Sequence, residues 1–410
     1  MKKFITKENF LYLVLFLSSI NILIWFYKKY IIGSREFFWD LAVNYCAGRI
    51  YANGYSPYGF LADNPIYKCI NESAGLNEAF AYNYTIHLAK LFSLFSFTSF
   101  TELKKIWFLV VCICTYFIFK NTKKIFDKDI NSILFLTILF FSFGGVFFQS
   151  LLIGNIAILG FTLISFSLLS LYKNNTKKFS LFILIASLIK PHFFFYILIA
   201  FIYKGKKFFK TFFYSFIFLF FIYFIDFFFN KELFLDFLNS MKTMKSDLWF
   251  SSFGGGIGIV SINEQLPSRI FSMLDIYIQT GPSIFSSTFW LFSSSVLLIG
   301  SIYLFSIKKY WLLSKTKLFF TFSILIVIMC LPRMAFYELY ITIPALFYIS
   351  KKFFYSANKS LSNFGFIFLL IMFGVHDINA IFFLISLTIF LLIYINLKKT
   401  NSKLSFIFEK

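Results

Sequence analysis

Long apolar runs separated by short lysine-rich breaks constrain the fold of this chain more than any other feature. The first run, residues 10–26, is long enough to span the roughly 30 Å hydrocarbon core of a bilayer as a helix. A spanning β-barrel would instead alternate apolar and polar residues in short segments. With 59% hydrophobic residues, 14% charged residues and a mean hydropathy of +0.78, the composition lies outside the soluble class. The sequence therefore predicts an all-α, polytopic integral membrane protein.

Five lysine-rich breaks and a lysine-rich tail follow the apolar runs, and they contain few acidic residues. The positive-inside rule predicts that each lies in the cytoplasm. Two breaks on the same side require an even number of crossings between them, and a polar turn occurs between neighbouring breaks. This pattern predicts about 12 helical segments in a single domain over residues 1–410, with both termini in the cytoplasm. The breaks and the tail are residues 120–128, 173–178, 204–210, 308–317, 351–359 and 398–410.

The N-terminal lysines resemble those of a signal peptide, but no small-residue cleavage site follows, which favours an uncleaved first helix. Two long segments are expected on the exterior side: residues 28–105, which include a helix lying along the membrane surface, and residues 230–285. The run over 179–203 is too short for two full crossings at about 1.5 Å per residue, so it predicts two half-helices that meet at Lys190-Pro191. All arginine and histidine residues lie outside the lysine-rich breaks. Because these side chains suit anion binding and proton transfer, we expect the chemistry on the exterior side.

The five cysteines form no metal-binding pattern, and the sequence leaves open whether Cys46 and Cys69 are bridged. No Ser-His-Asp arrangement, His-Glu-x-x-His motif or Cys/His cluster is present in the sequence, so hydrolase and metal-enzyme functions have little support. We therefore expect no cofactor and no metal. The net charge of +21 is explained by membrane orientation, and no nucleic-acid partner is expected.

Asp40 is the first candidate for chemistry. It follows three aromatic residues, Phe37, Phe38 and Trp39, close to where the first helix is expected to leave the membrane. An acid shielded from water at this point would suit a general base. The alternative is that Asp40 caps the helix expected over 41–51.

The motif Lys190-Pro191-His192 is the second candidate, because a cation among apolar neighbours at mid-membrane costs about 2.5 kcal/mol or more. A bound phosphate would offset this cost. The alternatives are that Lys190 reaches the membrane surface or pairs with a buried acid such as Asp226.

Other exterior segments carry polar residues whose interpretation stays open. The glycine-rich stretch over 249–269 lacks the Lys-Ser/Thr of a P-loop, and it is either a loop that closes over a substrate or a plain linker. Arg333 and Glu338 share a tight turn, where they contact a substrate or pair with each other. His376-Asp377 is interpreted as a hydrophilic turn, and Gly154-Asn155, taken alone, as a connection between helices.

The run from Trp39 to Tyr45, followed by Gly54-Tyr55-Ser56-Pro57-Tyr58, resembles the opening signature of glycosyltransferase family 87, the polyprenol-phosphate-mannose-dependent α-mannosyltransferases. That signature has an Asp, a Tyr shortly after it and a later Gly-x-x-Pro-Tyr. Asn155 stands where the family usually has Gln, and Glu338 where it has Asp or His. The further resemblances, in chain order, are the aromatic stretch over 80–84, Gly154-Asn155, the stretch from Ala186 to Lys190-Pro191, and Pro332-Arg333-Met334 with Tyr337-Glu338.

This resemblance implies an enzyme of the cell envelope that lies in the cell membrane and has a C-type glycosyltransferase fold. It further implies transfer of one sugar, a mannose-like hexose, from a polyprenyl-phosphate donor to a lipid or glycan acceptor on the exterior face. Asp40 would be the base of an inverting reaction. The residues implied to hold the donor phosphate are Lys190, His192 and Arg333. The residues implied to bind substrate are Tyr45, Tyr58, Asn155 and Glu338.

Two other functions remain open. A lipid-linked sugar flippase or other transporter would also need cations near mid-membrane, but it should show inverted repeats, which we do not find in the sequence. An O-antigen ligase or polymerase would use a lipid-diphosphate donor and carry several Arg and a His in a late exterior loop. The segment over 230–285 offers Arg269 and no His.

Overall fold

Helices form every regular element that the computed structural model describes, and no strand occurs among these residues. The described residues are 6–33, 36–58, 65–74, 82, 84–204, 208–246, 291–301, 316–331, 340–374 and 387–388. The first half of the chain forms α1 (Lys7–Phe26), α2 (Trp39–Ala52), α3 (Pro65–Ala74), α4 (Ile86–Ser93), α5 (Phe100–Phe126), α6 (Ser132–Phe141), α7 (Val146–Leu152) and α8 (Ala157–Tyr172). The second half forms α9 (Thr176–Ile189), α10 (Ile197–Lys204), α11 (Phe209–Phe229), α12 (Lys231–Ser246), a helix over Leu291–Ser301, α17 (Thr316–Met329), α18 (Ile343–Phe354) and α19 (Lys359–Gly374). An all-α fold was predicted, and the structure confirms it over the described residues.

Two of these helices are long and apolar enough to cross a membrane, and a bent pair adds a third candidate. They are Lys7–Ile32, in which a π-helical turn over Tyr27–Ile32 extends α1, and Phe209–Phe229. The bent pair is Ser132–Gly144 with Val146–Leu152, which meet at 87°. Several shorter apolar helices accompany them. These lengths and compositions support a membrane location.

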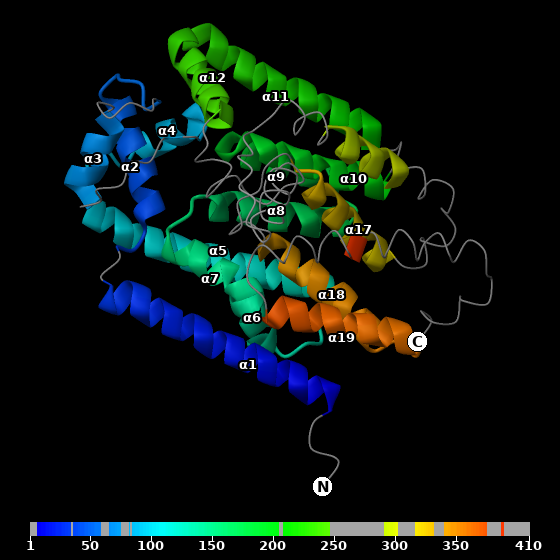
Figure 1. Cartoon of the computed structure of the whole chain (residues 1–410). Helices are drawn as coiled ribbons and strands as arrows, with labels where there is room; N and C mark the ends of the chain where they lie inside the picture. The colour runs from blue at the N-terminus through cyan, green and yellow to red at the C-terminus, as the bar shows by residue number, and fades with distance from the viewer. Residues whose placement is uncertain are drawn as a thin grey trace, which may run out of the picture.

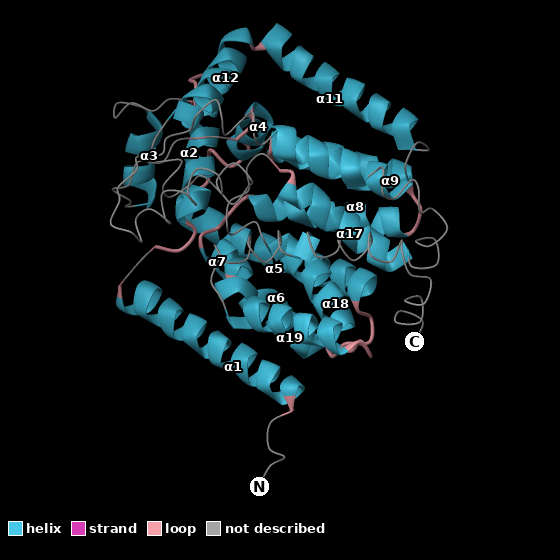
Figure 2. Cartoon of the chain, turned by 45° about the vertical axis from the view of Figure 1, so that its right-hand side comes forward, coloured by secondary structure: helices cyan, strands magenta, loops and turns pink. Residues whose placement is uncertain are grey.

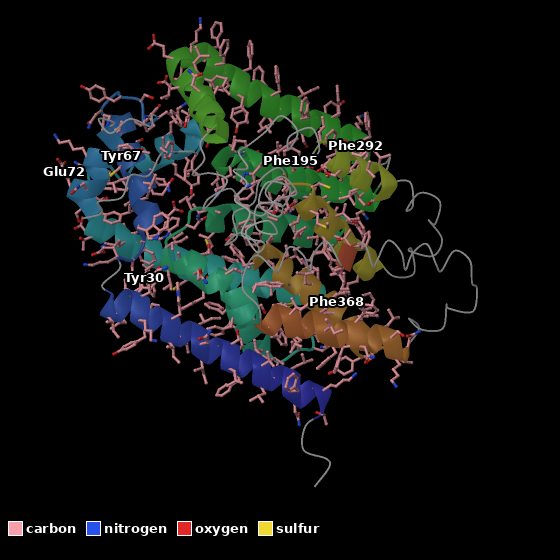
Figure 3. The ribbon with its side chains drawn as sticks, viewed as in Figure 1. Tyr30, Tyr67, Glu72, Phe195, Phe292 and Phe368 are labelled. Carbon is pink, nitrogen blue, oxygen red and sulfur yellow. A yellow bond between two sulfur atoms is a disulfide. The ribbon has the colours of Figure 1, made fainter. Side chains whose placement is uncertain are left out.

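α1 and α11 lie on opposite sides of the bundle, with α5, α8 and α9 between them (Figure 1). Aromatic side chains project outward from α11 (Figure 3), and Phe228 and Phe229 are 71% and 75% exposed. Apolar side chains with this much exposed area are unfavourable in water and favourable in an apolar environment, which a bilayer supplies. The buried core lies where α8 packs on α5 and α9, and where α18 packs on α19.

Several lysine-rich breaks meet at one end of the bundle. Lys351 Nζ lies 2.6 Å from Asp127 Oδ2, and the Tyr355 hydroxyl donates to Glu8 Oε1 at 2.9 Å. These contacts bring the α5–α6 break and the α18–α19 break to the start of α1.

The α8–α9 and α10–α11 breaks meet in the same way, because Lys204 Nζ donates to Asn174 Oδ1. The start of α17 lies beside them, since the Phe320 ring is 5.9 Å from Tyr172 and 5.3 Å from Tyr203 between centroids. Lys317 Nζ, 4.7 Å from the Tyr348 ring centroid, connects this group to α18. The described basic breaks therefore gather at one end, as the sequence pattern predicts.

α2 and α3 lie at the other end, on the left in Figures 1 and 2, where Tyr67 and Glu72 mark α3 in Figure 3. A disulfide between Cys46 and Cys69 joins the two helices. Gly48 of α2 packs against α4, where a Cβ would lie 2.4 Å from the Phe92 backbone carbonyl carbon. Only glycine allows the two helices to approach this closely.

α9 and α10 are the two short helices on either side of Lys190-Pro191 that the sequence predicts. α9 ends at Ile189, and Lys190 is extended at φ −136° and ψ 120°. A 3₁₀ helix over Pro191–Tyr196 then leads into α10. The contact between Lys204 and Asn174 shows that α10 returns to the end where α9 begins. Two short helical arms thus meet at Lys190.

Candidate functional site

Asp40 lies in the first turn of α2 and is 8% exposed. It does not cap the helix, because the N-cap position is held by Phe38, which makes no side-chain capping bond. The backbone N–H of Phe38 donates to the Leu152 carbonyl at 3.0 Å, and that of Asp40 donates to the Ile153 carbonyl at 2.9 Å. The start of α2 is therefore bound through its backbone to the turn between α7 and α8.

Gly154 makes this contact possible. Its φ of +71° lies in the left-handed region, and a Cβ on it would lie 2.9 Å from the Cα of Phe38. Phe38 itself is left-handed, at φ 61° and ψ 34°. Phe38 is thus a strained position, whereas glycine adopts this conformation freely, and the close packing of the two brings the next residue, Asn155, to face Asp40.

Two donors bind the carboxylate of Asp40, and both reach the same oxygen. Asn155 Nδ2 donates to Asp40 Oδ2 at 2.7 Å, and the Tyr84 hydroxyl donates to it at 3.3 Å. Asn155 Oδ1 accepts the backbone N–H of Ala157 at 2.8 Å, which fixes the amide with its nitrogen toward Asp40. Bonds from neutral donors to a carboxylate stabilise its charged form in a buried setting.

Lys190 reaches the same place from the break after α9. Its Nζ lies 5.1 Å from the centroid of the Tyr84 ring, which is a cation–π distance. The Thr85 hydroxyl donates to the carbonyl of Leu188, so the segment before α4 is bonded to the end of α9. We call Asp40, Tyr84, Asn155 and Lys190 the Asp40 cluster. It combines a buried acid, a cation and two polar donors from four separate segments.

A shell of tyrosines holds Tyr84 in place. The Tyr58 hydroxyl donates to the Tyr84 carbonyl at 2.9 Å, and the Tyr58 ring packs on Tyr82 at 5.4 Å. Burial raises the pKa of Tyr58 well above its usual value, and likewise the pKa of Tyr82, so both hydroxyls stay protonated and act as donors. Ser240 of α12 donates to the Tyr82 carbonyl at 3.4 Å. Tyr58, which the sequence suggested as a substrate contact, thus supports Tyr84.

The remaining predicted site residues lie in several places. The Tyr45 hydroxyl donates to the Thr98 carbonyl at 2.7 Å, and its ring packs on Phe100, so Tyr45 makes structural contacts. The His192 ring is half-buried and lies 4.8 Å from that of Phe193. The predictions that fall outside the described residues are those for Arg333, Glu338, residues 249–269 and His376-Asp377.

A second polar cluster joins α4 to α11. Asp226 of α11, 4% exposed, pairs with His87 Nε2 at 2.8 Å and with Lys90 Nζ at 3.2 Å. The sequence analysis considered Asp226 as a partner for Lys190, but its carboxylate contacts these two residues of α4 and forms its ion pair with Lys90. Two sequence features could have predicted this cluster. One is the single acid, Asp226, within the apolar run over 209–229, and the other is the pair His87 and Lys90, three residues apart on a short helix.

Within the described residues, no group of three His, Cys, Asp or Glu side chains could hold a metal ion. The Asp40 cluster can accept a proton through its carboxylate and can stabilise negative charge through Lys190.

Over the described residues the chain is helical, has helices compatible with a membrane location, and carries a buried acid and a cation at one end of its bundle. No family model matches the chain, and neither the curated proteins nor the solved structures include a significant match.

Proposed function

We propose that this protein is a membrane glycosyltransferase. It moves one hexose, of the mannose type, from a polyprenyl-phosphate donor to a lipid or glycan acceptor. One observation carries the proposal: the segments that resemble glycosyltransferase family 87 supply all four members of the Asp40 cluster. Residues that form a catalytic site lie close together in the fold. Residues that match the motifs of a family by chance need not.

Each member of the cluster has a role in the proposed reaction. The carboxylate of Asp40 takes the proton from an acceptor hydroxyl while the oxygen of that hydroxyl attacks the anomeric carbon. The bond from the anomeric carbon to the phosphate oxygen breaks, its electron pair leaves with the polyprenyl phosphate, and the anomeric configuration inverts. Lys190 neutralises the charge that develops on the phosphate. Asn155 and Tyr84 orient the carboxylate.

We place the site on the exterior face of a multi-pass membrane protein, with the lysine-rich end in the cytoplasm. The Lys-rich contacts at one end and the Asp40 cluster at the other support this orientation, as does the Cys46–Cys69 disulfide beside the cluster. Disulfides persist in oxidising compartments and are rare in the cytoplasm.

The test is sugar transfer by the purified protein in lipid, with radiolabelled polyprenyl-phosphate hexose as donor and a membrane extract as acceptor. Asp40→Asn should stay folded and lose about 10²- to 10⁴-fold in kcat, because only the proton acceptor is removed. Glu72→Gln is the matched control: it is the same change of acid to amide on exposed α3, and it should keep wild-type activity. Lys190→Ala should weaken donor binding.

Each contrary result has a distinct meaning. Transfer that survives in Asp40→Asn removes Asp40 as the base but keeps the reaction class. Unchanged donor affinity in Lys190→Ala removes Lys190 from the donor site. No transfer by the wild-type protein with any of several donors overturns the proposed function and favours a transporter.

A further inference from the structure

Three lysine-rich breaks meet at the end of the bundle opposite the Asp40 cluster. Lys351 Nζ in α18 lies 2.6 Å from Asp127 Oδ2 in the α5–α6 break. Lys317, at the start of α17, lies against the same helix α18, with its Nζ 4.7 Å from the Tyr348 ring centroid. The charges that act on Lys317 come from both other breaks. We call the following residues the break cluster: Lys128, Lys317, Lys351, Lys352, Asp127 and Asp129.

Positive charge greatly exceeds negative charge in these three breaks. Residues 120–129, 308–317 and 351–359 contain eleven lysines and two acids, Asp127 and Asp129. Asp127 is already paired with Lys351. Glu8, which its contact with Tyr355 brings to this end of the bundle, follows Lys7 in the sequence and adds no net negative charge. The acids therefore leave most of the lysine charge unbalanced.

Lys317 is the member of the break cluster that is most in need of an anion. It is half-buried and has no ion pair within the part of the chain that the structure describes. Burial lowers the pKa of Lys317, the charges of Lys128 and Lys352 lower it too, and the two Asp carboxylates act in the opposite direction. Salt screens a half-buried charge less than an exposed one, so an anion bound here is stabilised more than one at an exposed lysine.

Apolar surface adjoins the break cluster. α6 begins shortly after Asp129, and its side chains Ile133 and Leu136 are 76% and 38% exposed. The Tyr348 ring beneath Lys317 is of the kind that is enriched where a membrane meets water. A soluble anion would interact with the lysines alone, whereas a phospholipid also covers the apolar surface with its chains.

We propose that the break cluster binds an anionic phospholipid from the leaflet on the lysine-rich side. Lys317 and Lys352 contact the headgroup phosphate, and Lys351 stays paired with Asp127. An acyl chain lies along the exposed face of α6. Charge complementarity selects an anionic headgroup over a zwitterionic one. This site does not depend on the proposed transferase function, because it shares no residue with the Asp40 cluster.

Native mass spectrometry of the purified full chain in a neutral detergent tests the site. The protein is titrated with phosphatidylglycerol or phosphatidylcholine, and the lipid-bound ions are counted at each concentration. We expect phosphatidylglycerol to bind on the order of tenfold more tightly than phosphatidylcholine. Lys317→Gln with Lys352→Gln should weaken phosphatidylglycerol binding about 25-fold, because each lysine at a membrane surface contributes about fivefold. Binding of phosphatidylcholine should change little.

The same end of the bundle supplies a matched control. Lys177 and Lys178 are exposed in the first turn of α9 and lie in another lysine-rich break. Lys177→Gln with Lys178→Gln makes the same change of charge and should leave phosphatidylglycerol binding near the wild-type value. Lys317→Arg with Lys352→Arg keeps both charges and should also preserve binding, which shows that the two positions tolerate substitution.

Three results would overturn this site. The first is equal affinity of the wild-type protein for the two lipids, and the second is an equal loss in the Lys317→Gln, Lys352→Gln variant and in the control, which would mean a general attraction to net charge. The third is displacement of phosphatidylglycerol by inorganic phosphate at an ionic strength matched with chloride, which would mean a site for a soluble anion. Asp40→Asn should keep the lipid preference, so failure of sugar transfer is distinguishable from failure of this site.

Discussion

Tyr84 connects the acid and the cation of the Asp40 cluster. Its hydroxyl donates to Asp40 Oδ2, and its ring lies beneath Lys190 Nζ. One side chain thus orients the proposed base through a hydrogen bond and holds the proposed phosphate cation through its π face. The two contacts use different atoms, so substitution can separate them.

Tyr84→Phe should lower kcat by about fivefold to tenfold and leave the donor KM nearly unchanged, because it removes one hydrogen bond of about 1 kcal/mol and keeps the ring. Tyr84→Leu removes both contacts, so it should lower kcat further and raise the donor KM. Steady-state kinetics with varied donor measures the difference. Tyr55→Phe, which alters an exposed tyrosine, serves as control. Identical kinetics for Tyr84→Phe and Tyr84→Leu would mean that the ring does not hold Lys190.

Substitutions of Gly154 and Gly54 separate the energetic cost of a left-handed backbone from the cost of a steric clash. Gly154→Ala should destabilise the protein by about 2 kcal/mol or more, because the left-handed φ alone costs about 1–2 kcal/mol and the new Cβ collides with Phe38. Gly54→Ala has a φ of +81° with no atom within 4 Å of the Cβ, so it should show only the backbone cost. Apparent Tm in detergent measures both. An equal decrease in apparent Tm for the two variants would show that Phe38 moves aside without an energetic cost.

At the scale of elements, α4 is held on the bundle from several sides. Gly48 lets it pack closely on α2, the hydroxyl of Thr85 binds the end of α9, and Asp226 ties it to α11. Tyr84 immediately precedes this helix. The position of α4 therefore sets the position of the tyrosine that binds Asp40.

Asp226→Ala should lower the free energy of unfolding by about 2–4 kcal/mol. Losing one partner of a buried pair costs about 3–5 kcal/mol, and the 35% exposure of the Lys90 side chain reduces that cost. Adding His87→Leu and Lys90→Leu to the variant should recover part of the loss, because no cation is then left without a carboxylate. Apparent Tm in detergent is the measurement. Further loss in the triple variant would contradict the ion-pair account.

Much of the arrangement within each segment could be predicted from the sequence, whereas the contacts between segments could not. Composition predicts helices, and the short run with Lys190-Pro191 predicts the break after α9, because both depend on local residues. The bend between α6 and α7 was not predicted, since it depends on positive φ at Phe143 and Gly145 within an apolar run. Asp40, Asn155 and Lys190 were each identified separately, with Tyr84 as the end of an aromatic stretch. That Tyr84 joins them is a tertiary contact, and no local pattern encodes its geometry.

At the scale of the whole molecule, the proposed orientation separates two ends with different chemistry. The described lysine-rich breaks meet at one end, and the Asp40 cluster and the disulfide lie at the other. A transferase that uses a lipid-linked sugar on the exterior face requires the cluster to lie outside the cytoplasm. The proposed function therefore requires that the end of the bundle with the Asp40 cluster faces the exterior.

Cysteine labelling in intact cells measures this orientation. Ala52→Cys at the end of α2 and Ala357→Cys in the α18–α19 break are exposed, neutral and matched changes, introduced after Cys112→Ser removes the exposed free thiol. A membrane-impermeant maleimide should label Ala52→Cys at once, and Ala357→Cys only after permeabilisation, because the positive-inside rule keeps the lysine-rich break in the cytoplasm. The reverse pattern would place the Asp40 cluster in the cytoplasm, where the Cys46–Cys69 disulfide would be reduced and an exterior transfer reaction impossible.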